Sequence, residues 1–187
     1  MKQPVGVGAV NQLVGVEREI DDTGTDDDVT VRPAEPGELA AVAALRWRWI
    51  LENDGAAPPA VDREDFIRHF VTWAEHNAAS HRCMVLADSG VRILGMAWLA
   101  VVHRVPTPHA LHRASGDLQC VYVVPEARDA GLGGRLITET LARARELGLE
   151  RVTVHSSPRA IPAYARRGFE NSPRLLQAHV ARTTPYP

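Results

Sequence analysis

The chain has 187 residues, 45% of them apolar, which is enough for one globular domain with its own core. Its 21 basic and 23 acidic residues give a net charge of −2, so bulk charge favours neither nucleic acid nor an anionic membrane as a partner. The longest apolar run, Ile93 to Val102, is too short to span a bilayer. Cys83 and Cys120 lack the spacing of a zinc site or a disulfide framework, so we expect a reduced, cytoplasmic protein.

The first 28 residues differ in composition from the rest of the chain. They contain seven acidic residues against only Lys2 and Arg18, with glycine and threonine scattered among them. Such a segment cannot bury enough apolar surface to offset the entropy of ordering it. We therefore expect 1–28 to be a disordered acidic tail and 29–187 to be a single domain.

The amino-terminal half of that domain predicts a strand, two helices and a β-hairpin. Apolar residues alternate at 29–32 and then recur at helical spacing through Trp49, while Asp62 is a typical N-cap for the second helix. Asp88-Ser89-Gly90 predicts the hairpin turn. The expected elements are a strand at 29–32, a helix ending near 52, a helix from 62 to about 77, strands at 83–87 and 91–102, and a polar connection at 109–116.

The carboxyl-terminal half alternates strands with helices. A strand at 118–124 stops at Pro125, and after a short glycine-rich loop an amphipathic helix is expected at 135–147, with Gly148 as its C-cap. The remaining expected elements are a strand at 151–155, a helix that starts at 156–158 and is closed by Gly168, and a final strand at 175–180.

The glycine cluster between the strand at 118–124 and the following helix is typical of an anion site. Glycine lets the backbone approach a ligand closely, and the first N–H groups of a helix have no intrahelical partners. These groups also carry the positive end of the helix dipole, which favours a phosphate.

Three motifs in this half resemble the GNAT superfamily of acyl-CoA-dependent N-acyltransferases, and the order of elements over about 29–180 fits that family as well. The motifs are Val121 to Glu126, Arg128-x-x-Gly131-x-Gly133-Gly134, and Ser157-x-x-Ala160-x-x-x-Tyr164-x-x-x-Gly168-Phe169. The resemblance implies a mixed α/β fold: a strongly twisted sheet that splays apart between its fourth and fifth strands, flanked by about four helices.

The resemblance also implies a donor, acetyl-CoA, and the residues that hold it. The fourth strand would bind the pantetheine arm, and the loop amides would bind the pyrophosphate. Carried onto this chain, the implied cofactor-binding residues are Val121, Tyr122, Val123, Arg128, Asp129, Ala130, Gly131, Leu132, Gly133, Gly134 and Ser157. Ser157 stands where the family more often has Asn.

Acyl transfer needs a neutral amine, a polarised thioester carbonyl and a proton for the leaving thiolate. An alkyl ammonium with a pKa of about 10.4 needs roughly 4 to 5 kcal/mol to lose its proton at pH 7. By resemblance, Asp117 stands where some family members carry a catalytic carboxylate, although an Asp after Ser115-Gly116 is also an ordinary turn residue. The N–H of Val121 is the implied donor to the carbonyl oxygen. Tyr164 is the implied general acid, the alternative being a tyrosine packed inside a short helix.

Other aromatic and basic residues carry weaker functional hypotheses. Trp47 and Trp49 lie two apart on a helix and cannot share one face, so one belongs to the core and the other is free to line the acceptor site. Packing is the expected role of Trp98, His103 and His155. The pair at 109 and 112 has ligand-like spacing without supporting ligands, so no metal is expected. The arginines at 166 and 167 favour a solvated face, with a phosphate contact as the alternative.

The sequence therefore predicts an N-acetyltransferase that transfers an acetyl group from acetyl-CoA to an amine acceptor. The alternative is an acyl-CoA-binding sensor or interaction module of the same fold without turnover. A dinucleotide-binding or P-loop protein is disfavoured, because neither a Gly-x-Gly-x-x-Gly nor a Gly-Lys-Ser/Thr motif is present. The acceptor is not identified by the sequence. A homodimer is common in such folds and is kept as an expectation.

Overall fold

The computed structural model describes residues 29–53, 59–89, 91–178 and 180. Within these ranges one sheet has five strands in the order β1-β2-β3-β4-β5. The first four strands run antiparallel to their neighbours, and β5 joins β4 in parallel. The strands are β1 (Thr30–Pro33), β2 (His81–Ala87), β3 (Ile93–Arg104), β4 (Arg113–Val123) and β5 (Val152–Val154).

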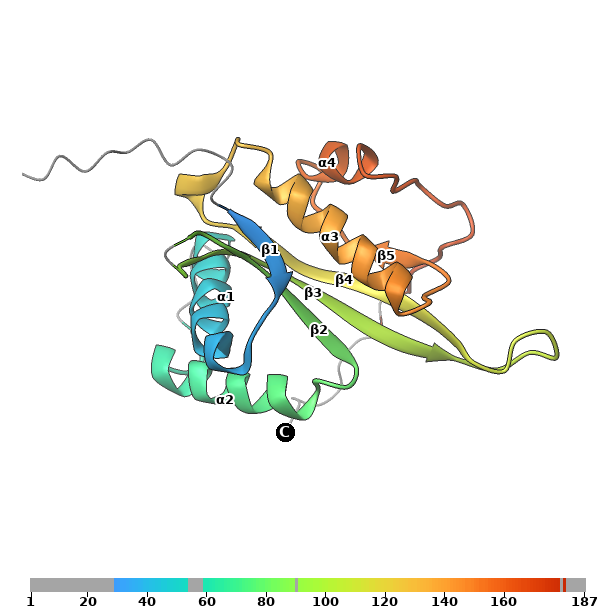
Figure 1. The fold of residues 1–187 in the computed structure, drawn as a ribbon, viewed down its shortest axis with the longest axis horizontal. Coiled ribbons are helices and arrows are strands. Elements are labelled where there is room, and N and C mark those ends of the chain that lie inside the picture. Colours follow the sequence, from blue (N-terminus) through green and yellow to red (C-terminus); the bar gives the residue numbers. More distant parts are fainter. Residues whose placement is uncertain (1–28, 54–58, 90, 179, 181–187) are drawn as a thin grey trace, which may run out of the picture.

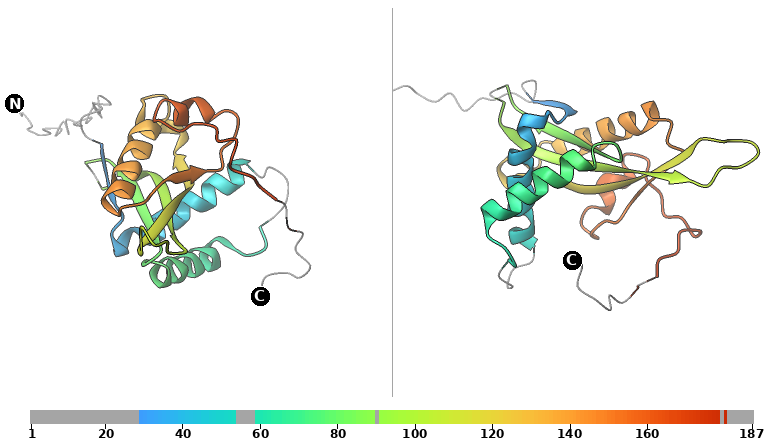
Figure 2. Two further views of the ribbon diagram at one scale, coloured as in Figure 1. Left: turned by 90° about the vertical axis from the view of Figure 1, so that its right-hand side faces the viewer. Right: turned by 90° about the horizontal axis from the view of Figure 1, so that it is seen from below.

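Helices cover both faces of this sheet, with α1 and α2 on one side and α3 and α4 on the other (Figures 1 and 2). They are α1 (Leu39–Asn53), α2 (Arg63–His76), α3 (Leu132–Glu146) and α4 (Ile161–Ala165), with short 3₁₀ turns η2 (Pro36–Glu38) and η3 (Pro125–Ala127). The mixed sheet between two helical layers confirms the predicted fold class.

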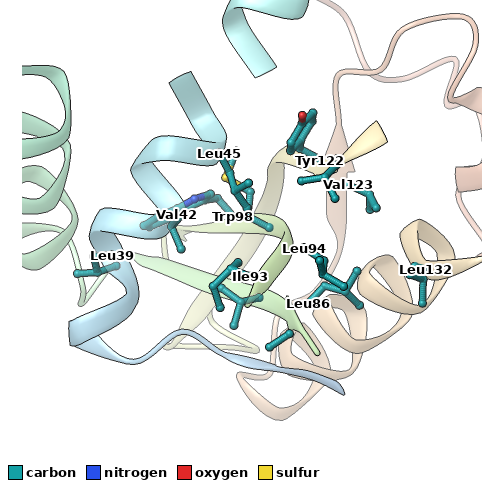
Figure 3. Close-up of a cluster of buried hydrophobic side chains, with 14 of the residues drawn as sticks. Leu39, Val42, Leu45, Leu86, Ile93, Leu94, Trp98, Tyr122, Val123 and Leu132 are labelled. Carbon is teal, nitrogen blue, oxygen red and sulfur yellow. The ribbon is translucent and has the colours of Figure 1, made fainter. Parts of the chain in front are cut away.

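The core lies on both faces of β3, whose first eight residues are all buried. On the α1 side, Val42 and Leu45 pack toward Trp98 and Tyr122 in one apolar cluster (Figure 3). On the α3 side a second cluster joins Leu118, Leu136, Ile137 and Tyr164. Because burying an apolar side chain contributes about 1.5 to 3 kcal/mol, these two clusters fix β4 firmly between the helical layers.

Several predicted boundaries are confirmed. The Asp62 carboxylate accepts the N–H of Asp65 at 2.8 Å and caps α2, which ends at His76 as expected. Gly148 has a φ of +67° directly after α3, the left-handed conformation that suits glycine at a helix end.

The predicted boundaries of β4, α3 and α4 were wrong. β4 begins at Arg113, within the segment expected to be a polar connection, because it pairs with the end of β3 in a hairpin that projects from the body (Figures 1 and 2). The Arg113 guanidinium donates to the Val105 carbonyl just after β3 at 3.1 Å and to Glu150 before β5 at 2.6 and 2.9 Å, so a polar side chain anchors the start of β4. Helix α3 begins at Leu132 rather than 135, and α4 spans only five residues.

The final strand expected at 175–180 is not formed in the part of that segment that is described. Residues 175–178 and 180 have no regular structure, and His179 lies outside the described residues. Leu175, Leu176 and Val180 are exposed there, so their side chains bury little apolar surface. The tail at 1–28 and most of the loop at 56–59 also lie outside the described residues, as does Gly90 of the hairpin turn.

Candidate functional site

The site is organised by a β-bulge in β4. The register with β3 pairs Trp98 with Gln119 and Met96 with Tyr122, so two residues of β4, Cys120 and Val121, stand opposite the single residue between those partners. Cys120 has a φ of +54°, an uncommon conformation for a residue other than glycine. Such an insertion bends the strand and increases its twist.

The parallel strand β5 leaves β4 just before this bulge. β5 pairs with β4 only opposite Gly116, Asp117 and Leu118. Beyond Leu118, the β5 side of β4 has no strand partner within the described chain. The two strands therefore diverge at the point where the sequence predicted the sheet to splay.

The backbone of Val123 faces this divergence. The N–H of Val124 donates to Leu94 of the β3 side at 2.9 Å, so strand alternation turns the Val123 N–H and C=O away from β3. Val121 lies two residues earlier on the same side of the strand, with its side chain in the α3 cluster. Val121 and Val123 thus present their main-chain groups where β5 is absent.

The loop after β4 offers further free amides. No backbone acceptor is found in the described chain for the N–H groups of residues 129–133, which end at the first turn of α3. The N–H of Arg128 instead donates to Pro125 at 3.2 Å, and that of Gly134 donates to Gly131 at 2.9 Å. The amides available to an anion are therefore those of Asp129, Ala130, Gly131, Leu132 and Gly133.

The three glycines of this loop have different physical roles. Gly131 is the N-cap of α3 with a φ of +76°, a left-handed conformation that side chains disfavour. A Cβ on Gly133 would meet only Val123 Cγ2 at 3.8 Å and would otherwise point into open space. A Cβ on Gly134 would lie 2.3 Å from Arg167 Nη2. Close approach of a ligand therefore concerns Gly133, whereas Gly134 makes room for an arginine of the chain itself.

Arg167 joins α4 to α3 and is one of the arginines for which the sequence left two roles open. Its Nε–H donates to the Gly134 carbonyl at 3.1 Å, which places the guanidinium beside the first turn of α3. Its backbone N–H donates to Tyr164 at 2.9 Å. Tyr164 is thus tied through this residue to the helix that carries the free amides, while Arg166 is exposed.

Two of the residues that the resemblance implied as acetyl-CoA contacts have side chains that bind Glu52. The Tyr122 hydroxyl donates to Glu52 Oε1 at 2.6 Å, and the Arg128 Nη2 group donates to Glu52 Oε2 at 2.9 Å. The Arg128 guanidinium also lies 5.4 Å from the Tyr122 ring centroid, and its Nε–H donates to the Val123 carbonyl at 2.9 Å. Tyr122 and the Arg128 side chain therefore fasten the loop to the end of α1.

Burial and neighbouring guanidinium groups shift the pKa values of the acidic groups where α1, β4 and the loop meet. Burial, with the hydrogen bond to Glu52, raises the pKa of Tyr122 to about 12. Two arginines, Arg48 and Arg92, bind Glu126 at the start of the loop, and the hydrogen bond from Arg48 lowers the pKa of Glu126 to about 2. The pKa of Glu52 is lowered by Tyr122 and Arg128 against the opposing effect of burial. All three carboxylate and phenol groups hold fixed protonation states near neutral pH.

Asp117 lies on the α1 side of β4, opposite in direction to Leu118. It is half-buried, and its Oδ2 accepts a hydrogen bond from Gln119 at 2.7 Å. Asp117 is paired on both sides, with Ala100 of β3 and Thr153 of β5. It is therefore a strand residue, one position before the last residue of β4 that pairs with β5, and not a turn residue.

Tyr164 approaches the divergence from the other face. The side chain is 8% exposed, its ring meets Phe169 edge-on at 5.4 Å, and burial raises the pKa of its hydroxyl. It lines a cavity of about 620 Å³ together with β5 and residues after α4. Asp117 and Tyr164 thus lie on opposite sides of the sheet near the same break between β4 and β5.

The remaining predicted residues are placed as follows. Ser157 is exposed in the turn between β5 and α4. Trp47 packs against Phe66 of α2 at 5.4 Å, and Trp49 lies 6.4 Å from the Tyr122 ring. Trp98 is buried as expected, but His103 and His155 are exposed, so packing is the wrong role for these two histidines.

Neither a metal nor a membrane span is indicated by the described residues. Both histidines at 109 and 112 are exposed on the β3–β4 hairpin. The described part of the chain holds no cluster of three or more His, Cys, Asp or Glu arranged to bind a metal. Over the same ranges, every helix is too short or too polar to cross a bilayer.

The divergent strands, the bulge and the amide-lined loop define an acyltransferase of mixed α/β fold. The model of the acetyltransferase (GNAT) domain matches residues 54–186, and the chain belongs to this family. A solved acetyltransferase with acetyl-CoA from Clostridium acetobutylicum shares the fold, with a TM-score of 0.64 and 18% identity, covering 81% of this chain and 96% of that one.

Two curated relatives resemble the sequence more closely. Mycothiol acetyltransferase from Pseudarthrobacter chlorophenolicus is 27% identical over 163 residues, which is 84% of this chain and 47% of the relative. The chain thus spans about half the length of that protein. Glucosamine 6-phosphate N-acetyltransferase from Trypanosoma brucei brucei is 35% identical over 65 residues, which is 35% of this chain and 44% of that one.

Two residues of the site were missed by sequence reasoning, and both lie on α1. Glu52 and Arg46 are separated by six residues and fall on the same side of the helix as Trp49. The available signal was their spacing from Trp49, a residue already considered for the acceptor site: each lies three positions from it.

Proposed function

We propose that this chain is an N-acetyltransferase that transfers the acetyl group of acetyl-CoA to an amine by direct attack on the thioester. The observation that carries the proposal is the edge of β4 at Val121 and Val123, which has no strand partner on its β5 side in the described chain, next to a loop with five free amides. Pantetheine carries amide groups that match a strand edge, and a pyrophosphate matches free N–H groups at a helix start. The donor supplies the activated acetyl group.

Different residues bind the pyrophosphate, the thioester oxygen and the pantetheine arm. The N–H groups of 129–133 bind the pyrophosphate oxygens, and the open space at Gly133 lets them come close. The Val121 N–H donates to the thioester oxygen and stabilises the charge that develops there. Val123 aligns the pantetheine arm through its N–H, since its carbonyl already accepts from Arg128.

The two proton transfers are assigned to Asp117 and Tyr164, which lie on opposite faces of the sheet. Asp117, held by Gln119, takes the proton of the acceptor ammonium directly or through water. Tyr164 gives a proton to the leaving thiolate, and its raised pKa keeps the hydroxyl protonated at neutral pH. Entry of the amine from the α1 side then leaves the departing sulfur on the α4 side.

The relatives suggest acceptors to try. One relative is a glucosamine 6-phosphate N-acetyltransferase, so we propose an amino sugar or a related small amine as the acceptor class. The remaining alternative is a module that binds acyl-CoA without turnover.

Thiol release from acetyl-CoA across a panel of amines tests the proposal. Loss of a general acid or base typically costs about 10²- to 10⁴-fold in rate. We therefore expect Tyr164→Phe and Asp117→Asn each to lower kcat by at least about 10²-fold, with little change in the acetyl-CoA dissociation constant. Glu139→Gln, on the exposed face of α3, is the matched control. Tight acetyl-CoA binding without release for any amine would instead favour the sensor.

A further inference from the structure

Arg46 of α1 lies beside the bulge of β4, on the same side of the sheet as Asp117. Its guanidinium carbon is 4.2 Å from the centroid of the Trp49 ring. The Cys120 thiol is affected by two opposing charges: Arg46 lowers its pKa and Asp117 raises it, while burial raises it most. Arg46 and Asp117 therefore both lie within electrostatic reach of the residue that precedes Val121.

Arg46 is half-buried, and among the described residues its side chain has no hydrogen-bond acceptor. Its Nη1 atom is fully shielded from solvent without a partner. In the described ranges, the other arginines without a side-chain acceptor are all exposed: Arg63, Arg104, Arg145, Arg151, Arg159, Arg166 and Arg174. A shielded N–H without an acceptor is destabilising, and such groups are rare unless a ligand or water completes them.

The neighbouring carboxylates do not neutralise this charge. Glu52 lies six positions further along α1. It already accepts hydrogen bonds from Tyr122, Arg128 and Arg48. One oxygen of Asp117 accepts from Gln119, and no ion pair joins Asp117 to Arg46 in the described chain. The Trp49 ring stabilises the cation from one side but offers no acceptor. The acceptor side of the site therefore carries an uncompensated guanidinium.

We propose that Arg46 binds an anionic group of the acceptor, so that the acceptor is a small amine that also carries a phosphate or carboxylate. A guanidinium binds either group through paired, charge-assisted hydrogen bonds. Arg46 stacks on Trp49, whose ring lies 6.4 Å from the ring of Tyr122 on β4, so an anion bound at Arg46 lies near Val121, where the amine of the same molecule must be for transfer. This inference rests on the proposed function.

Matched amines that differ only in a phosphate test the inference. Acetyl transfer is measured with glucosamine and glucosamine 6-phosphate, and with ethanolamine and O-phosphoethanolamine. A charge-assisted hydrogen bond is worth about 10- to 100-fold in kcat/KM, so wild type should prefer each phosphorylated amine by that factor. Arg46→Met should bring the ratio close to one by raising KM for the phosphorylated member, and Arg46→Lys should restore part of it.

Arg145→Met is the matched control, because Arg145 is an exposed arginine without an acceptor at the far end of α3. This variant should keep the wild-type ratio. A ratio near one in wild type, or one that survives Arg46→Met, would overturn the inference even if acetyl transfer is observed.

A binding measurement separates this inference from the proposed function. Isothermal titration with O-phosphoethanolamine and ethanolamine, with CoA present, should show tighter binding of the phosphorylated amine to wild type and not to Arg46→Met. Binding of that kind without turnover would support the anion site and contradict the enzyme. Equal binding of both amines to wild type would contradict the anion site. If Arg46→Met fails to fold, Arg46→Lys and the wild-type comparison carry the test.

Discussion

Glu52 shows how one side chain connects the two halves of the site. It lies in the last turn of α1, and its oxygens accept hydrogen bonds from the Tyr122 hydroxyl of β4 and the Arg128 guanidinium of the loop. Arg128 in turn donates to the Val123 carbonyl, so the position of the loop after β4 depends on a residue of α1. The resemblance implied the backbone amide of Arg128 as a pyrophosphate contact, and the structure adds a structural role for its side chain.

Glu52→Gln is expected to weaken acetyl-CoA binding by about two- to fivefold, because a partly exposed ion pair contributes about 0.2 to 1 kcal/mol. The amide keeps the shape of the side chain but removes the charge that holds Arg128. Equilibrium titration of acetyl-CoA measures the effect, with Glu139→Gln as the control. If the variant bound acetyl-CoA more tightly, Arg128 would be a phosphate ligand that Glu52 holds back.

At the scale of elements, two glycines at the start of α3 have different roles: one fixes the backbone conformation, and the other is proposed to leave room for the ligand. Gly131 adopts a left-handed conformation, and Gly133 borders open space within the helix. The two glycines look equivalent in the sequence motif. Only the backbone angle of one and the empty surroundings of the other distinguish them.

Alanine at each position should separate these roles. Gly131→Ala places a side chain in the left-handed region and should cost about 1 kcal/mol in the free energy of unfolding. Gly133→Ala should stabilise the helix by up to about 1 kcal/mol while its methyl group weakens acetyl-CoA binding by about tenfold, the equivalent of one charge-assisted hydrogen bond. Chemical denaturation and acetyl-CoA titration of both variants measure this. If Gly133→Ala bound acetyl-CoA as tightly as wild type, the proposal that the pyrophosphate binds at this turn would be wrong.

At the scale of the whole molecule, paired carboxylates tie separate elements together. Glu38 is bound by Arg32, Glu126 by Arg48 and Arg92, and Glu150 by Arg113. The pKa of each of these carboxyl groups is lowered, chiefly by its hydrogen bond to an arginine. These contacts join β1 to η2, α1 to the donor loop, and β4 to the segment before β5.

Thermal stability should therefore fall in acid. A carboxyl group with a lowered pKa contributes stability that is complete above its unfolded pKa and is lost as pH falls toward its folded pKa. For Glu126 that window runs from its ordinary value of 4.5 down to about 2. We expect Tm to decline from about pH 5 toward pH 2, and Glu126→Gln to decline less steeply in scanning calorimetry. A flat Tm across this window would show that these pairs do not stabilise the fold.

The sequence predicted the elements that are defined by strong local patterns. Asp62 caps α2 and Gly148 closes α3 because both effects are local to a single helix end. β4 was predicted too short because its first residues are mostly polar and lack the apolar alternation of a strand, yet they pair with the end of β3 across the hairpin. The strand expected at 175–180 is not formed at 175–178 and 180, the part of it that is described, because an apolar run does not by itself supply a pairing strand.

The site was predicted in outline through its motifs, but its side chains were not. The free amides follow from glycine positions and a helix start, both of which a sequence displays. Pairing of Glu52 with Arg128 across 76 residues depends on the packing of α1 against β4. The same is true of Arg46, whose missing acceptor becomes apparent only when its burial is known.

The most direct test of the central claim is to observe which backbone amides respond to acetyl-CoA. Titration of ¹⁵N-labelled protein followed by two-dimensional NMR reports each N–H separately. The account predicts that the largest shifts fall on Val121, Val123 and residues 129–133, while the amides of Arg128 and Gly134, already bonded within the loop, change less. Shifts confined to the cavity between β5 and the residues after α4, or no saturable shifts, would contradict it.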